Sequence, residues 1–147
     1  MRRFQPDLRD KWAAGRSVVL YGAGGAGQNV ARHLATHGIL AAAFVDARAA
    51  PGEIRAGLPV LTLAEWVQSG RAAGADVIVC IHNHLVNVAP IIDSLRASGF
   101  ARVLPMVDYI DLFPDDPYER YWLAPTDYYD DKSPTRISIR TSQASCE

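Results

Sequence analysis

The stretch SVVLYGAGGAGQNVARHLATHG, residues 17–38, decides the fold of this chain. It begins with an apolar, β-branched run (17–21) and continues through a glycine turn (22–27). An amphipathic segment follows and reaches about His37, with Gly38 as a helix stop. The pattern therefore predicts a buried strand, a tight turn and a helix.

The glycines of this turn have the G-x-G-x-x-G spacing, with Gly22, Gly24 and Gly27 at the three positions. In that motif the first glycine permits the turn, the second lets a pyrophosphate approach the backbone, and the third lets the helix pack on the strand. The amides of Gly24, Gly25 and Ala26 are expected at the helix N-terminus, where unpaired N–H groups favour an anion. The turn thus predicts a phosphate-binding corner. A tight turn beside an empty groove is the alternative.

An acidic residue ends the next predicted strand. In dinucleotide-binding folds such a residue lies roughly 20 positions beyond the glycines and accepts hydrogen bonds from ribose hydroxyls. Residues 41–45 form the predicted strand, and Asp46 follows it directly. Arg48 could bind a 2′-phosphate, but Asp46 would repel that group. The pair therefore favours an NAD-like or other nucleoside without a 2′-phosphate, and a solvated Asp46 is the alternative.

The rest of the chain alternates between strand and helix patterns with short connections. This predicts a Rossmann-like α/β fold with a parallel sheet of about five strands and helices on both faces. The strand at 17–21 is expected at the centre, between the strand ending at Asp46 and the strand at 76–81. The other predicted elements are helices at 6–14, 62–70 (opened by a Thr62/Glu65 capping box) and 88–98, a loop at 47–57, and strands at 58–61 and 102–107.

His82 and Asn83 follow the strand at 76–81, together with His84. The carboxyl ends of parallel strands share one edge of a sheet, so these side chains are expected near the glycine turn. There they could bind a phosphate, a ribose or a base edge, and a simple hydrogen-bonded turn is the alternative. Two histidines without a third ligand do not predict a metal site.

Other titratable residues give no catalytic signature. We find no Ser/His/Asp order, no convincing carboxylate pair and no dehydrogenase-type proton donor, so no catalytic residue is predicted. His33 and His37 lie four residues apart on the first helix and are expected on its outer surface. Cys80 lies inside an apolar run and is expected to be a small core residue.

Composition limits the class of protein. The chain has 147 residues, a formal net charge of −1 and 49% hydrophobic residues, which suits one domain around a single core. This balance offers no basic field for nucleic acid or an anionic membrane. No apolar run approaches the roughly 20 residues of a spanning helix. Only two cysteines, Cys80 and Cys146, are present, which favours a reducing, cytoplasmic setting.

The predicted domain covers residues 1–129, and its last part, 109–129, is aromatic and proline-rich. This part either caps the sheet or forms a docking surface. Residues 130–147 are polar and Ser/Thr-rich, and we expect them to be a disordered tail.

Six segments resemble the N-terminal Rossmann-like domain of FkbM-type methyltransferase proteins: VVLYGAGGAG, AFVDA, GLPVLTLAEW, DVIVCIHNH, APIIDSLRASGFARVLPMVD and DLFPDDPYERYWLAP. The resemblance covers about residues 17–129. It implies that methyl transfer belongs to a following S-adenosylmethionine domain, which nothing in this chain matches. The implied partner of residues 109–129 is such a domain or a second copy. A similar strand–turn–helix plan opens sugar O-acetyltransferases, where it holds a nucleotide-sugar.

Together these observations predict a nucleotide- or nucleotide-sugar-binding accessory domain without catalysis of its own. The expected ligand is an NAD-like dinucleotide or a nucleotide-sugar, with S-adenosylmethionine as a third candidate. Two alternatives stay open: a structural or interaction module with an empty groove, and a small NAD-dependent oxidoreductase.

Overall fold

The computed structural model describes residues 7–81 and 85–114. The chain divides into a unit that ends at Leu112 and a second that begins at Phe113, and the fold below is that of the first. Its strands are β1 (Ser17–Tyr21), β2 (Ala43–Val45), β3 (Ile54–Arg55), β4 (Leu58–Leu61), β5 (Ala75–Val79) and β6 (Arg102–Pro105). Its helices are α1 (Leu8–Ala13), α2 (Gly25–Thr36), α3 (Leu63–Gln68), α4 (Ala89–Ala97) and α5 (Met106–Asp111), with a 3-10 turn at Ala72–Gly74.

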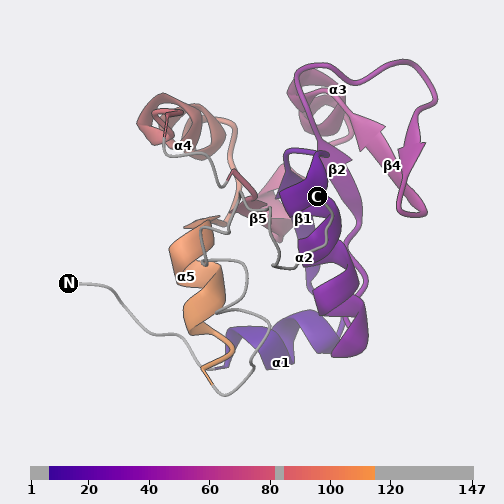
Figure 1. Cartoon of the computed structure of the whole chain (residues 1–147). Helices are drawn as coiled ribbons and strands as arrows, with labels where there is room; N and C mark the ends of the chain where they lie inside the picture. The colour runs from indigo at the N-terminus through magenta and orange to yellow at the C-terminus, as the bar shows by residue number, and fades with distance from the viewer. Residues whose placement is uncertain (1–6, 82–84, 115–147) are drawn as a thin grey trace, which may run out of the picture. The chain divides into compact units, whose positions relative to one another are not determined.

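The six strands form one sheet in the order β3-β4-β2-β1-β5-β6. Figure 1 labels β4, β2, β1 and β5 of this sheet. All neighbours pair in parallel except β3 and β4, which are antiparallel. In β1, Val19 lies opposite Ala43 of β2 on one side and Val77 of β5 on the other. The predicted Rossmann-like α/β class is therefore confirmed, with β1 flanked by the two predicted strands.

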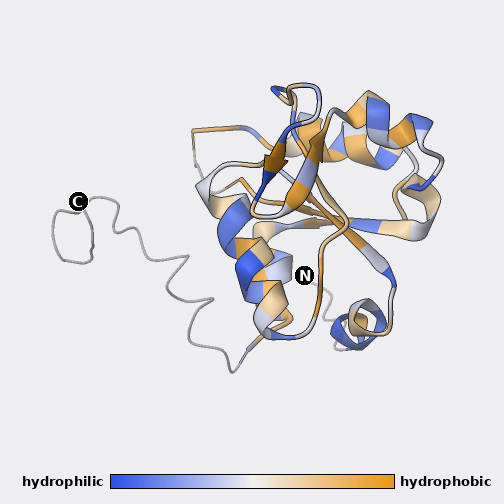
Figure 2. Cartoon of the chain, turned by 90° about the vertical axis from the view of Figure 1, so that its right-hand side faces the viewer, coloured by the Kyte–Doolittle hydropathy of each residue, from blue (hydrophilic) through white to orange (hydrophobic). Residues whose placement is uncertain are grey.

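Helices cover both faces of the sheet. Successive strand residues point to opposite faces, so each face presents apolar side chains to the helices that lie on it. Val19, Val45 and Val77 share one apolar cluster with Trp66 of α3 and Leu95 of α4. The intervening strand residues face the other side, where α2 lies. Figure 2 shows the strands of the sheet mainly in hydrophobic colours, whereas the helices carry a mixture of hydrophobic and hydrophilic residues.

A fully buried carboxylate joins α1 to β5. Asp76 accepts hydrogen bonds from Trp12 Nε1 at 2.8 Å, from Arg16 Nε at 2.8 Å and from Arg16 Nη2 at 2.9 Å. Arg102 Nη1 of β6 lies 3.9 Å from Asp76 Oδ1. The bond to Asp76 raises the pKa of Arg16. This network fixes α1 to the sheet, and Leu8 and Trp12 of this helix are buried.

Two short elements differ from the sequence predictions. The predicted loop at 47–57 contains β3, which forms a two-residue hairpin with β4 through Ala56 (φ 49°) and Gly57 (φ 78°). Positive φ at both turn positions is usual for such hairpins, but alanine is an unusual residue there. The predicted strand at 102–107 ends at Pro105, and α5 begins directly after it.

The prediction that His33 lies on the outer surface of its helix was wrong. His33 is only 4% exposed, and its Nδ1 lies 2.5 Å from the hydroxyl oxygen of the buried Tyr109 in α5. The face of α2 that appears polar in the sequence is therefore covered by a helix that the sequence did not reveal. Within the described ranges no helix combines the length and apolar character needed to cross a membrane.

Candidate functional site

The glycine turn lies between the end of β1 and the start of α2, at the carboxyl edge of the parallel strands. Gly22 has φ +104°, in the region that favours glycine, and its amide donates to Val45 O of β2 at 2.8 Å. Gly24 is the N-cap of α2, with extended backbone angles of φ −79° and ψ −162°. The turn therefore leaves the central strand and enters the helix within three residues, so the helix begins inside the predicted turn at 22–27.

The fold itself requires Gly27. A β-carbon on Gly27 would lie 1.9 Å from the Gly22 carbonyl oxygen and 3.3 Å from the Phe44 ring. This close approach is the helix-on-strand packing that the third glycine of the motif provides.

Gly24 and Gly25 differ from Gly27 because nothing in the described fold surrounds them. A β-carbon at either position would have no heavy atom within 4 Å, and neither residue has a positive φ. The described packing and backbone geometry therefore do not demand glycine at these two positions. What these glycines provide is open space in front of the backbone.

The first amides of α2 precede its hydrogen-bond ladder. The first i to i−4 hydrogen bond runs from Gln28 N to Gly24 O at 3.0 Å. The amides of residues 24–27 come before that bond, so they have no partner within the helix. α2 contains 12 residues, so the helix dipole adds positive polarity at the same place. This end of the helix offers donors to an anion.

The structure brings Asp46 to the glycine turn. Asp46 Oδ2 accepts from Ala23 N at 2.9 Å, and Oδ1 accepts from Arg48 N at 2.9 Å. Asp46 therefore ties the turn to the end of β2. Each carboxylate oxygen has two lone pairs, so each retains acceptor capacity for a hydroxyl group.

Sequence reasoning missed two residues at this turn, Glu53 and Arg55. Arg55 Nη1 donates to Ala23 O at 3.3 Å, and Arg55 Nε donates to Glu53 Oε2 at 2.6 Å. Glu53 Oε1 also accepts from Ala50 N at 2.9 Å. The Ala50 hydrogen bond, assisted by Arg55, lowers the pKa of Glu53. Only the hairpin of β3 and β4 brings these side chains near residue 23, so no local pattern in the sequence could indicate them.

The residues at the end of β5 do not add to the described site. His82, Asn83 and His84 fall outside the described residues. Cys80, which precedes them, is 5% exposed, and burial raises the pKa of its thiol. The prediction that Cys80 belongs to the core is confirmed, and a protonated buried thiol is unsuited to act as a nucleophile.

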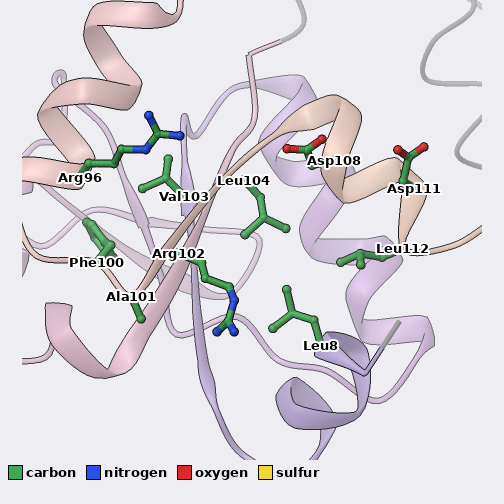
Figure 3. A pocket seen from close by; sticks show the side chains of 10 residues that line it. All are labelled: Leu8, Arg96, Phe100, Ala101, Arg102, Val103, Leu104, Asp108, Asp111 and Leu112. Carbon is green, nitrogen blue, oxygen red and sulfur yellow. The ribbon is translucent and has the colours of Figure 1, made fainter. Parts of the chain in front are cut away.

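A pocket of about 350 Å³ lies beside β6 and is drawn in Figure 3. Leu8 of α1, Leu104 of β6 and Leu112, which follows α5, lie around it together with charged side chains of both signs. Its lining residues are Leu8, Arg96, Phe100, Ala101, Arg102, Val103, Leu104, Asp108, Asp111 and Leu112. None of them belongs to the glycine turn, so this pocket is separate from the candidate site.

The described residues thus define a Rossmann-like α/β domain with an open glycine corner, a carboxylate tied to it and an arginine reaching it from a hairpin. No protein-family model matches the chain, and no curated protein or solved structure matches it significantly.

Proposed function

We propose that this chain is a nucleotide- or nucleotide-sugar-binding accessory domain without catalysis of its own. One observation carries the proposal: Gly24 and Gly25 face open space, although their backbone angles and described surroundings do not require glycine. A diphosphate that must approach the backbone supplies a reason for glycine at both positions.

In this proposal each part of the corner has a role. The amides of Gly24, Gly25, Ala26 and Gly27 hold the diphosphate, and Asp46 accepts from ribose hydroxyls through its remaining lone pairs. On the sequence argument, His82 and Asn83 close the other side of the ligand. An NAD-like dinucleotide and a nucleotide-sugar both fit this scheme, and S-adenosylmethionine is the third candidate.

The resemblance to FkbM-type proteins supports an accessory role beside a methyltransferase domain. The sequence predicted residues 109–129 as a cap or a docking surface, and Tyr109 and Ile110 at its start are buried in the fold. On this proposal the part of this segment beyond the described residues docks that domain or a second copy of the chain. We also propose a reducing, cytoplasmic setting, since one of the two cysteines is buried as a free thiol.

Calorimetric titration of the wild-type chain with NAD, a UDP-sugar and S-adenosylmethionine tests the proposal. The Gly24→Val variant then tests the site, because its branched side chain would occupy the space in front of the amides. We expect the affinity to fall at least about tenfold, which corresponds to about 1.4 kcal/mol. Replacing a glycine N-cap with valine should cost about 1 kcal/mol of stability, so the fold should be retained.

Gly74→Val is the matched control. A β-carbon added at Gly74 would also have no heavy atom within 4 Å, and its φ is not positive, but Gly74 precedes the amino end of β5. Ligand affinity should be unchanged in this variant. Absence of binding by the wild type to all three compounds would reject the proposal and favour a structural module. Unchanged affinity in Gly24→Val would show that the phosphate lies elsewhere.

A further inference from the structure

We propose that Arg55 determines ligand specificity at the glycine turn, and that the ligand class is a nucleoside diphosphate ester and not S-adenosylmethionine. This inference rests on the proposed function and adds a residue outside the glycine motif. It is carried by the position of the Arg55 guanidinium, which the hairpin of β3 and β4 brings to the residue before Gly24.

The guanidinium of Arg55 is held from two directions. Its Nη1 donates to Ala23 O at 3.3 Å, and its Nε donates to Glu53 Oε2 at 2.6 Å. Glu53 is itself held by the Ala50 amide at 2.9 Å. The cation is therefore placed beside the turn before any ligand binds, and little side-chain freedom would be lost on binding.

Donors remain on this guanidinium. An arginine carries five N–H groups in a planar fork that matches phosphate oxygens, and the two hydrogen bonds described above use two of them. The Arg55 side chain is 48% exposed, so a ligand can reach it. Arg55 would thus contact a phosphate from the hairpin side while the amides of residues 24–27 contact it from the helix side.

The presence of phosphate oxygens separates the candidate ligands. A diphosphate brings negative charge to a guanidinium and to unpaired amides, and hydrogen bonds between charged partners are the stronger kind. The sulfonium of S-adenosylmethionine brings positive charge and no phosphate. Glu53 and Asp46 balance the charge of Arg55 at this turn, so the discrimination comes from the remaining N–H donors of its fork. Arg55 would therefore favour the nucleoside diphosphate class, because the sulfonium compound has no phosphate oxygens to accept from these donors.

The experiment compares affinities along two phosphate series, adenosine, AMP and ADP, and uridine, UMP and UDP, with S-adenosylmethionine as a further probe. Calorimetry measures the tighter ligands, and NMR titration measures the weaker ones. In Arg55→Gln we expect the affinity for the preferred diphosphate to fall about tenfold to a hundredfold, whereas affinity for its nucleoside stays unchanged. The ratio of diphosphate to nucleoside affinity is the readout, because general loosening of the turn would lower both.

Arg32→Gln is the matched control for net charge. Arg32 is exposed on α2, and its guanidinium bonds to Asn29 of the same helix. All affinities should be unchanged in this variant at constant ionic strength. Arg55→Lys keeps the charge but loses the planar fork, so it should recover only part of the diphosphate affinity. Thermal unfolding of each variant establishes that it is folded.

The outcomes separate the inference from the proposed function. If the wild type binds no compound, both fail. If the wild type binds a diphosphate and Arg55→Gln binds it equally well, only this inference fails. It also fails if nucleoside and diphosphate lose affinity equally, because Arg55 would then act only as a support for the turn. Tighter binding of S-adenosylmethionine than of either diphosphate would overturn the proposed ligand class.

Discussion

At the scale of single residues, the G-x-G-x-x-G motif contains glycines of different kinds. Contact requires glycine at position 27, because a β-carbon there would lie 1.9 Å from the Gly22 carbonyl oxygen. Backbone conformation favours glycine at position 22, where φ is +104°. Neither contact nor backbone conformation requires glycine at positions 24 and 25, so a ligand can explain the residue type there.

This distinction predicts opposite effects of the same substitution at neighbouring positions. Gly27→Ala should destabilise the fold by about 3 kcal/mol or more, because the colliding atom belongs to the backbone and cannot rotate away. Gly25→Ala should be neutral or stabilise the chain by up to about 1 kcal/mol, since its β-carbon meets no atom and alanine favours a helix. Chemical denaturation measures both free energies of unfolding. Equal stabilities would contradict the close approach of α2 to the turn.

At the scale of elements, polar groups fix how the short helix α1 joins the sheet. The fully buried Asp76 accepts from Trp12 of α1 and from Arg16 just before β1. Such a network is costly to break, because removal of the carboxylate leaves the Trp12 indole N–H buried without a partner and Arg16 without its ion pair.

Asp76→Ala should therefore lower the free energy of unfolding by about 3–5 kcal/mol. Asp76→Asn should cost less, since its amide oxygen can still accept from the Trp12 indole. Asp93→Ala, at an exposed position of α4, serves as the control and should change stability by less than about 0.5 kcal/mol. Urea titrations followed by tryptophan fluorescence give these values. A cost for Asp76→Ala no larger than that of Asp93→Ala would show that α1 is held by apolar packing alone.

At the scale of the whole molecule, the described sheet buries β1 and β5 at its centre, and Cys80 comes directly after β5. The Cys80 amide donates to Tyr21 O at 2.9 Å, and its side chain is buried. The thiol should therefore become accessible only when the sheet opens.

In a Cys146→Ser background, we expect Cys80 to react with a thiol reagent at a rate that follows the unfolding equilibrium as denaturant increases. Burial raises the pKa of the Cys80 thiol, so the folded chain should be nearly inert near neutral pH. Ser94→Cys in the same background provides a thiol at an exposed position of α4 as a reference. Reaction of Cys80 as fast as this reference without denaturant would contradict the buried position.

Local patterns predicted the parts of the fold that local chemistry controls. The Thr62/Glu65 capping box is present, with hydrogen bonds of 2.8 and 3.1 Å, because both partners lie within one turn. The hairpin was missed because Ala56 adopts a positive φ that its residue type does not suggest. The burial of His33 and the position of Arg55 depend on contacts distant in sequence, which periodicity cannot show.

The candidate site also has a part that local sequence predicts and a part that depends on contacts distant in sequence. The glycine turn and Asp46 were predicted because their spacing reflects one strand–turn–helix–strand unit, and the structure places them together. Glu53 and Arg55 were not predicted, since they reach the turn from a hairpin that tertiary pairing creates.

The attachment of the glycine turn to the innermost strand has one last consequence. β1 is hydrogen-bonded along both sides, and the Gly22 amide extends the bonding to β2. An anion arriving at the corner would therefore meet a rigid receptor surface and not a loop that must first become ordered. Preorganisation of this kind makes recognition depend on the shape of the incoming group, with little entropy lost by the protein.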